Sequence, residues 1–297
     1  MSSLPWIDAA RIASLLTMAQ AVDVIEAALA AGLDTSADPA RSVVPVAHGQ
    51  LLLMPSQTHD AVGVKLASVA PGNPELGLPR IQAVYVLFDS VTLAPVALLD
   101  GVALTSLRTP AMSAVAVRHL AVAEASRLVV FGSGPQAAGH VEALRAVRDV
   151  HDVVIVGRDR GRAAALADAV GGRVGSVADV AQADIVVCAT SSADALFDGA
   201  LVRGGACVIA VGSHEPHVRE LDEGLMQRAH VVVEDVATAM REAGDVIRAG
   251  LGAKQLTPIS DVVTGRMAFA DDAPRVFKSV GMAWQDLAVA AEVVRRA

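Results

Sequence analysis

The chain has 297 residues, of which 53% are hydrophobic and 19% charged, so it can bury a sizeable core without disulfides or metal ions. Its formal net charge of −8 argues against a nucleic-acid partner, and no apolar run reaches membrane-spanning length. Cys188 and Cys207 lie in apolar, strand-like runs and are expected to be buried free thiols. Residues 1–6 lack the basic and long apolar regions of a signal peptide. These features predict a cytoplasmic protein with neither a metal site nor a membrane partner.

The first hundred residues combine one helical segment with several short strands. Apolar residues recur at helical spacing over residues 7–33, and residues 34–39 break the pattern. Short apolar runs then alternate with turns such as Pro71-Gly72-Asn73-Pro74. The expected strands span residues 43–46, 51–54, 63–68, 83–88 and 96–99. This pattern predicts one helix packed on an antiparallel or mixed sheet.

A further helix is expected over residues 104–122. Thr109 and Pro110 form a typical start signal, with threonine as N-cap and proline as the first helical residue. This interpretation places Arg108 and Thr109 at a helix N-terminus, where unpaired N–H groups and the helix dipole favour anions. We interpret the helix as the bridge into the next domain.

Residues 127–137 carry the most informative pattern in the chain. A short apolar run, residues 128–131, ends in Gly132-Ser133-Gly134-Pro135-Gln136-Ala137, and an amphipathic segment follows. The first glycine permits a tight turn, and the second lets the backbone approach a pyrophosphate at the helix N-terminus. A second strand, residues 153–156, follows at the spacing of a βαβ unit. The pattern therefore predicts a dinucleotide site.

Strands and helices alternate from residue 128 onward, which implies a parallel sheet with right-handed crossovers. The expected strands are residues 128–131, 153–156, 173–174, 184–189, 206–211 and 230–233, and the expected helices are 135–148, 160–169, 177–182, 236–250 and 276–297. Glycine, serine and threonine residues follow several strands, at the edge where such sheets bind ligands.

The end of the second strand bears on the choice of nucleotide. NAD-selective sheets usually place an acidic residue there, but this chain has Gly157. Arg158 follows, with Arg160 and Arg162 nearby, and guanidinium groups suit a 2′-phosphate. The same arginines could instead form a solvated cluster, and Asp159 could bind a ribose hydroxyl. We expect NADP(H) to be preferred, with NAD(H) still possible.

An ordered set of motifs resembles the ornithine cyclodeaminase/mu-crystallin family from Arg41 to Asp286. The motifs are Leu53-Met54-Pro55, Gly63-Val64-Lys65, Pro71-Gly72-Asn73-Pro74, Asp100-Gly101, Thr105-x-x-Arg108-Thr109-x-Ala111-x-Ser113, the glycine turn with Gln136, Val211-Gly212-Ser213, Arg219-Glu220-Leu221-Asp222 and Val276-Phe277-Lys278-Ser279-Val280-Gly281. The resemblance implies an α/β protein in which a Rossmann domain, residues 115–274, is inserted into an α+β domain. That second domain, residues 1–114 and 275–297, would bind substrate and form a homodimer.

The resemblance also implies roles for individual residues. Residues matching Arg41, Lys65 and Arg108 hold the substrate carboxylate in this family, and three cations in an acidic chain suit that task. Lys65 is also the candidate for proton delivery, with His214 a weaker candidate. The cofactor would be bound by Arg108, Thr109, Gly132, Ser133, Gly134, Pro135, Gln136, Arg158, Asp159, Arg162, Thr190, Val211, Ser213 and Ser279.

Two positions depart from the ornithine cyclodeaminases. His214 stands where those enzymes carry a catalytic aspartate, and Leu52 stands where they carry an acidic residue. The groups that would recognise a second substrate amine are therefore missing. Residues 156–162 and 242–246 are similar to the NADPH-binding mu-crystallin branch of the family.

We therefore expect an NADPH-dependent reductase of small cyclic ketimine carboxylates, such as pyrroline- or piperideine-2-carboxylate. Three alternatives stay open. The first is an alanine- or opine-type amino-acid dehydrogenase, and the second is an ornithine cyclodeaminase that recycles its NAD. The third is a non-catalytic protein that binds NADPH and a carboxylate-bearing ligand.

Overall fold

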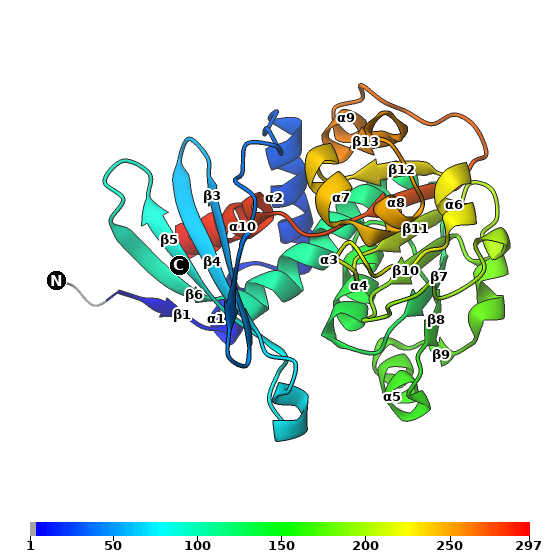
Figure 1. The fold of residues 1–297 in the computed structure, drawn as a ribbon, viewed down its shortest axis with the longest axis horizontal. Helices are drawn as coiled ribbons and strands as arrows, with labels where there is room; N and C mark the ends of the chain where they lie inside the picture. Colours follow the sequence, from blue (N-terminus) through cyan, green and yellow to red (C-terminus); the bar gives the residue numbers. More distant parts are fainter. Residues whose placement is uncertain (1–3) are drawn as a thin grey trace. The chain divides into compact units, whose positions relative to one another are not determined.

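A computed structural model describes residues 4–297, which divide into two compact units (Figure 1). Unit 1 comprises residues 4–28, 34–108 and 282–297, and unit 2 comprises residues 29–33 and 109–281. The chain thus leaves unit 1, builds unit 2 and returns, as the expected α/β fold with an inserted Rossmann domain requires. Among the described residues no single helix is both long and apolar enough to cross a membrane. The helices Ala9–Leu15 and Met18–Ala30 reach that length and apolar composition only when they are taken together, and the chain bends between them.

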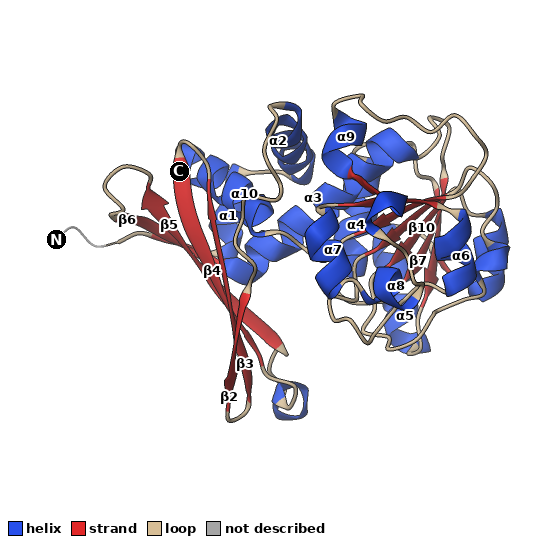
Figure 2. Ribbon diagram, turned by 45° about the horizontal axis from the view of Figure 1, so that its top comes forward, coloured by secondary structure: helices blue, strands red, loops and turns tan. Residues whose placement is uncertain are grey.

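Unit 1 is built on a six-stranded mixed sheet with the order β1-β6-β5-β4-β3-β2. The strands are β1 (Trp6–Ile7), β2 (Ser42–Val46), β3 (Gly49–Gln57), β4 (Ala61–Val69), β5 (Ile81–Asp89) and β6 (Pro95–Asp100). Only the pairing of β1 with β6 is parallel. The helix α10 (Ala283–Arg296) packs on β3, β4 and β5 (Figure 2). Because side chains alternate along β4, Lys65 shares the buried face with Ala61 and Ala67.

The expected single helix over residues 7–33 is wrong, because the segment forms two helices, α1 (Ala9–Leu15) and α2 (Met18–Ala30). Leu16 has an extended backbone and ends α1. The Thr17 backbone N–H donates to the Gln20 side chain at 3.0 Å, and the Gln20 N–H donates back to the Thr17 hydroxyl at 3.4 Å. This capping box starts α2, and its signature Thr-x-x-Gln is present in the sequence.

The helix α3 (Gly101–Leu120) begins three residues before the expected range 104–122 and nine residues before Pro110, the expected first helical residue of the start signal. Asp100 caps it, because its carboxylate accepts hydrogen bonds from the backbone of Val102 and Ala103, both at 2.9 Å. Pro110 lies inside the helix. The prediction that Arg108 and Thr109 occupy a helix N-terminus is therefore wrong. The helix dipole and unpaired N–H groups of a helix start consequently give no reason to expect an anion at these two residues.

Unit 2 is a Rossmann-type sheet of eight parallel strands with the order β13-β12-β14-β11-β10-β7-β8-β9. The strands are β7 (Arg127–Phe131), β8 (Asp152–Val156), β9 (Arg173–Val174), β10 (Ile185–Cys188), β11 (Cys207–Ala210), β12 (His230–Val233), β13 (Leu256–Pro258) and β14 (Arg275–Lys278). The α-helices within it are α4 (Pro135–Arg145), α5 (Arg160–Val170), α6 (Glu223–Arg228), α7 (Val236–Glu242), α8 (Gly244–Arg248) and α9 (Ile259–Val263). The predicted alternation of strands and helices is confirmed.

Three details of unit 2 differ from the expectation. Residues 276–297 are not one helix, because β14 pairs with β11 and β12 before α10 begins. The domain boundary expected at residue 275 therefore moves to Met282. Residues 236–250 form two helices separated at Ala243, whose backbone is extended, and residues 177–182 form a 3₁₀ helix.

Candidate active site and dinucleotide site

The buried face of the unit 1 sheet carries an ion pair between Lys65 on β4 and Asp286 on α10. Lys65 Nζ lies 2.6 Å from Asp286 Oδ2, and their side chains are 5% and 0% exposed. Lys65 Nζ also lies 3.4 Å from the Thr105 hydroxyl. The ammonium group is therefore fixed by strand, helix and counter-ion together.

Arg108 on α3 joins this pair from the other side of Asp286. Its Nε lies 3.4 Å from Asp286 Oδ1, and its Nη1 donates to Gln285 Oε1 at 2.9 Å. Sequence reasoning missed Asp286 and Gln285. The available signal was a polar pair in the otherwise apolar start of an amphipathic helix. Both residues are fully buried and hold the predicted cations.

Burial is the main cause that lowers the pKa of Lys65 to about 8. Asp286 opposes this by favouring the charged ammonium, whereas the positive charges of Arg108 and Arg41 lower the pKa further. The structure thus brings Lys65 and Arg108 together around Asp286, with Arg41 close enough for its charge to act on Lys65.

Asp38 and Tyr85 complete this cluster. The Asp38 carboxylate accepts a hydrogen bond from the Trp284 backbone at 2.8 Å, and burial raises its pKa. Tyr85 lies opposite Lys65 in the β4–β5 register, and its buried hydroxyl has no hydrogen-bond partner among residues 4–297. A side chain at Gly63 would collide with the Tyr85 ring, which explains this glycine of the Gly-Val-Lys motif.

The predicted glycine turn of unit 2 connects β7 to α4. Gly132 has a φ of +123°, and a Cβ there would lie 2.5 Å from the Ala189 carbonyl oxygen. Gly134 is the N-cap of α4 without a side-chain cap, and Pro135 is in its first turn. The buried Gln136 Oε1 has no hydrogen-bond partner among residues 4–297. The glycine turn and the start of α4 fit a dinucleotide, because the backbone N–H groups of a helix start can donate hydrogen bonds to a pyrophosphate.

The end of β8 carries the residues predicted to select the nucleotide. Arg158, Arg160 and Arg162 are exposed. The Asp159 carboxylate caps α5 by accepting the Arg162 backbone N–H at 3.0 Å. A Cβ at Gly157 would lie 3.7 Å from the Ser133 hydroxyl, so this strand end adjoins the glycine turn. The structure therefore brings Arg158 and the glycine turn to one edge of the sheet.

A buried carboxylate, Glu220, holds the loops after β10 and β11. It accepts hydrogen bonds from the Thr190 backbone and hydroxyl, at 2.8 and 2.7 Å, and from the Gly212 backbone at 2.7 Å. Burial raises the Glu220 pKa. The hydroxyl of Thr190, a predicted cofactor residue, is thus bound to Glu220. Val211, another predicted cofactor residue, begins the loop after β11, which Glu220 also contacts through Gly212.

A second buried group, Lys278 with Asp245, underlies the loop after β11. Lys278 Nζ lies 3.0 Å from Asp245 Oδ2 and donates to the Ser213 carbonyl at 2.7 Å, and both side chains are fully buried. Asp245 also accepts from the Ser213 hydroxyl at 2.6 Å and from the Glu220 and Leu221 backbone at 2.7 and 2.8 Å. Sequence reasoning gave neither Lys278 nor Asp245 a role.

Three further residues of the predicted site are Ser279, Thr109 and His214. The Ser279 hydroxyl donates to Glu234 at 2.9 Å. Thr109 lies within α3, and its carbonyl accepts from the Ser113 hydroxyl at 3.2 Å. His214 is half-buried in the loop after β11, in unit 2, whereas Lys65 belongs to unit 1.

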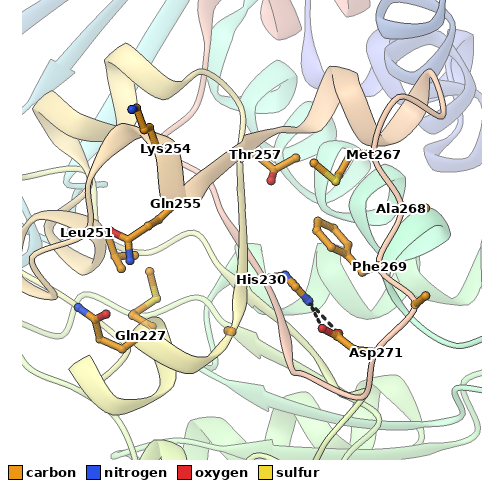
Figure 3. Close-up of a pocket in the computed structure, with 13 residues that line it drawn as sticks. Gln227, His230, Leu251, Lys254, Gln255, Thr257, Met267, Ala268, Phe269 and Asp271 are labelled. Atoms are coloured by element: carbon orange, nitrogen blue, oxygen red, sulfur yellow. Dashed lines mark hydrogen bonds and ion pairs between the residues drawn. The ribbon is translucent and has the colours of Figure 1, made fainter.

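A hollow of about 480 Å³ lies at the amino ends of strands β12 and β13 (Figure 3). The glycine turn, by contrast, follows the carboxyl end of β7. It contains His230, the first residue of β12, which lies 2.7 Å from Asp271 and stacks on Phe269 with ring centroids 4.3 Å apart. Because His230 marks the amino end of its strand, this hollow is distinct from the carboxyl edge with the glycine turn. It contains none of the predicted site residues.

The cysteines are buried and free, as predicted. Burial is the main cause that raises the pKa of Cys207 to about 12. Burial also raises the pKa of the Cys188 thiol well above its usual value, so both remain thiols. Within residues 4–297, no group of three or more histidine, cysteine, aspartate or glutamate side chains is arranged to hold a metal ion.

The Rossmann sheet with its glycine turn, joined to a unit with a buried cation cluster, defines an NAD(P)-dependent oxidoreductase. The chain belongs to the ornithine cyclodeaminase/mu-crystallin family, whose model matches residues 7–297. The resemblance described from the sequence is thereby confirmed.

Two reductases are similar to this chain over most of their length. A Delta(1)-pyrroline-2-carboxylate reductase from Bacillus cereus (strain ZK / E33L) is 35% identical over 279 residues, covering 87% of this chain and 86% of the relative. The ketimine reductase mu-crystallin of Rattus norvegicus is 35% identical over 264 residues, covering 86% and 83%.

Solved structures show the same fold. The Thermococcus litoralis Delta(1)-pyrroline-2-carboxylate reductase, in complex with NADH and L-proline, has a TM-score of 0.93 and 26% identity, covering 99% of this chain and 97% of its own. An archaeal alanine dehydrogenase dimer with bound NAD has a TM-score of 0.93 and 27% identity, covering 99% and 96%.

Proposed function

We propose that the protein is an NADPH-dependent reductase of small cyclic ketimine carboxylates of the pyrroline- or piperideine-2-carboxylate type. The observation that carries the proposal is the cluster of Lys65 and Arg108 around Asp286, with the charge of Arg41 nearby. Guanidinium and ammonium groups at one site suit a substrate carboxylate. The names of the Bacillus cereus and rat relatives, and the L-proline in the Thermococcus litoralis structure, support this substrate class.

In this proposal the protein's residues bind and orient the imine and supply its proton. Arg41, Lys65 and Arg108 hold the carboxylate, which fixes the adjacent imine carbon. When bound, the nicotinamide cofactor supplies the hydride that this carbon accepts. Lys65 Nζ donates a proton to the imine nitrogen, so that the products are a cyclic amino acid and the oxidised cofactor.

The test is a set of reactions followed at the nicotinamide absorbance. Pyrroline-2-carboxylate and piperideine-2-carboxylate should be reduced with NADPH, without any need for ammonia. Reduction of pyruvate only with ammonia would favour the alanine dehydrogenase alternative, which the archaeal structure supports. Failure to oxidise NADPH with any cyclic imine or 2-oxo acid would contradict the proposal and favour a binding protein.

Ornithine serves as the diagnostic negative substrate. Leu52 on β3 is only 8% exposed and would present hydrocarbon to the distal ammonium of ornithine. A buried charge without a partner is costly, so we expect ornithine to bind poorly. Formation of ammonia and proline from ornithine, without net oxidation of NADPH, would show a cyclodeaminase instead.

Arg158→Ala is predicted to weaken NADPH binding far more than NADH binding, by ~1–3 kcal/mol for a lost charge-assisted pair. The reason is that an exposed guanidinium follows Gly157, where an acidic residue would select NAD. Dissociation constants for both cofactors measure the effect. Arg266→Ala, which removes another exposed arginine, after α9 (Ile259–Val263), is the control and should change neither dissociation constant. Equal losses for both cofactors, or a wild-type preference for NADH, would contradict NADPH selectivity.

We also propose a homodimer formed through unit 1, because its sheet leaves apolar side chains exposed. Val43, Val44, Val46, Leu51 and Leu66 are 38–49% exposed on neighbouring strands β2, β3 and β4. The archaeal alanine dehydrogenase is a dimer. Leu66→Glu should therefore shift the sedimentation coefficient from dimer to monomer at micromolar concentration. Val91→Glu, at an 87% exposed turn, should leave it unchanged, and a monomeric wild type would refute the proposal.

A further inference from the structure

Asp286 is the carboxylate that joins the two buried cations of unit 1. It lies in the first turn of α10 and has no solvent exposure. One oxygen, Oδ2, accepts the 2.6 Å hydrogen bond of Lys65 Nζ, whereas Oδ1 lies 3.4 Å from Arg108 Nε without forming a hydrogen bond. The short contact therefore goes to Lys65, and Arg108 is held instead by Gln285.

The surroundings of Lys65 would otherwise favour its neutral form. Burial and the charges of Arg108 on α3 and Arg41 before β2 act in that direction. Thr105 contributes a neutral hydroxyl from α3, and Tyr85 faces Lys65 across the β4–β5 register. Asp38 lies farther along the cluster, where its charge and that of Asp286 both act on the Tyr85 hydroxyl. Asp286 is thus the carboxylate in hydrogen-bond contact with the Lys65 ammonium.

We propose that Asp286 is the positioning residue for Lys65: it keeps the ammonium group charged and directs it as the proton donor to the imine nitrogen. The catalytic part of this inference rests on the proposed function. The proton moves from Lys65 Nζ to the substrate nitrogen, and the lysine recovers it from water afterwards. Asp286 itself neither gives nor receives a proton.

The first test needs no substrate, because the chain contains only three lysines, Lys65, Lys254 and Lys278. Selective ¹³C-lysine labelling gives three side-chain signals, and the signal lost in Lys65→Met identifies Lys65. In Asp286→Asn the titration midpoint of Lys65 should fall by at least one pH unit, while the exposed Lys254 keeps its midpoint. An unchanged Lys65 midpoint would overturn the inference.

A control on the same helix separates a local effect from a general one. Glu292→Gln makes the same chemical change at a surface ion pair with Arg295 and Arg296, and it should leave the Lys65 midpoint unchanged. If Asp286→Asn does not fold, Asp286→Glu keeps the charge with a longer side chain. That variant should preserve the midpoint within about half a pH unit but slow turnover, and a fall as large as one unit would overturn the inference.

The second test is the pH profile of imine reduction. In Asp286→Asn the alkaline limb of kcat/KM should move to lower pH by the same amount as the Lys65 midpoint. A purely structural role would lower activity at every pH and leave the limb in place, which would overturn the inference. If the wild type reduces no imine at all, the proposed function fails, whereas the lysine titration still decides whether Asp286 controls Lys65.

Discussion

Lys65→Met should lower kcat/KM for a cyclic ketimine carboxylate by about 10²–10⁴-fold, the range typical for loss of a general acid. Methionine keeps the length of the side chain but removes both the proton donor and one cation of the carboxylate site. Because Lys65 has a pKa of about 8, it is protonated below that pH and loses its proton above it. Wild-type kcat/KM should therefore be level below pH 8 and decline above it.

The pH profile also provides the control for this prediction. In Lys65→Met the alkaline decline near pH 8 should disappear, since the titrating group has been removed. Lys254→Met, which changes an exposed lysine of unit 2, should leave both the rate and the profile unchanged. A Lys65→Met variant with wild-type kcat/KM would show that another group delivers the proton.

The second large effect is expected for Asp245→Asn, which should lower the free energy of unfolding by about 3–5 kcal/mol. The substitution leaves the Lys278 ammonium, which is fully buried, without its counter-ion at 3.0 Å. The loop after β11 should loosen as well, because Ser213 and the backbone of Leu221 donate to the same carboxylate. Urea unfolding measures the loss of stability, and dinucleotide affinity measures the disorder of the loop.

An exposed carboxylate in the same sheet is the matched control. Asp152 on β8 lies 3.8 Å from Arg173 with a side chain that is 42% exposed. Asp152→Asn should therefore change stability by less than about 1 kcal/mol, as is usual for surface ion pairs. A loss of similar size in both variants would mean that the Lys278–Asp245 pair contributes no more than a surface pair.

Local patterns were sufficient to predict most of the fold. The alternation of apolar runs and glycine turns gave the parallel sheet, because each signal lies within a few residues of the element that it specifies. The same local reading failed for α3, where Thr109-Pro110 resembles a helix start although Asp100 already caps the helix. It failed again for β14, since a short apolar run such as Val276-Phe277 fits either a strand or a helix.

The candidate site was only partly predictable for a different reason. Lys65, Arg108 and Arg41 were identified through the family motifs, but the partner of Lys65 lies 221 residues away on α10. Likewise, Lys278 is paired with Asp245, and neither position shows in the sequence that the other is its counter-ion. Pairings between distant segments follow from tertiary packing, which composition and periodicity do not encode.

The discontinuous construction of unit 1 has a consequence for the order in which the chain acquires structure during its synthesis. Helix α10 covers β3–β5 but is synthesised after all the strands of both sheets. Until then, the sheet face with Lys65 lacks both its apolar cover and its counter-ion, whereas every strand of the parallel sheet has already been made once β14 is complete. The nascent chain therefore completes the nucleotide-binding fold first and the carboxylate site only after α10 has been made.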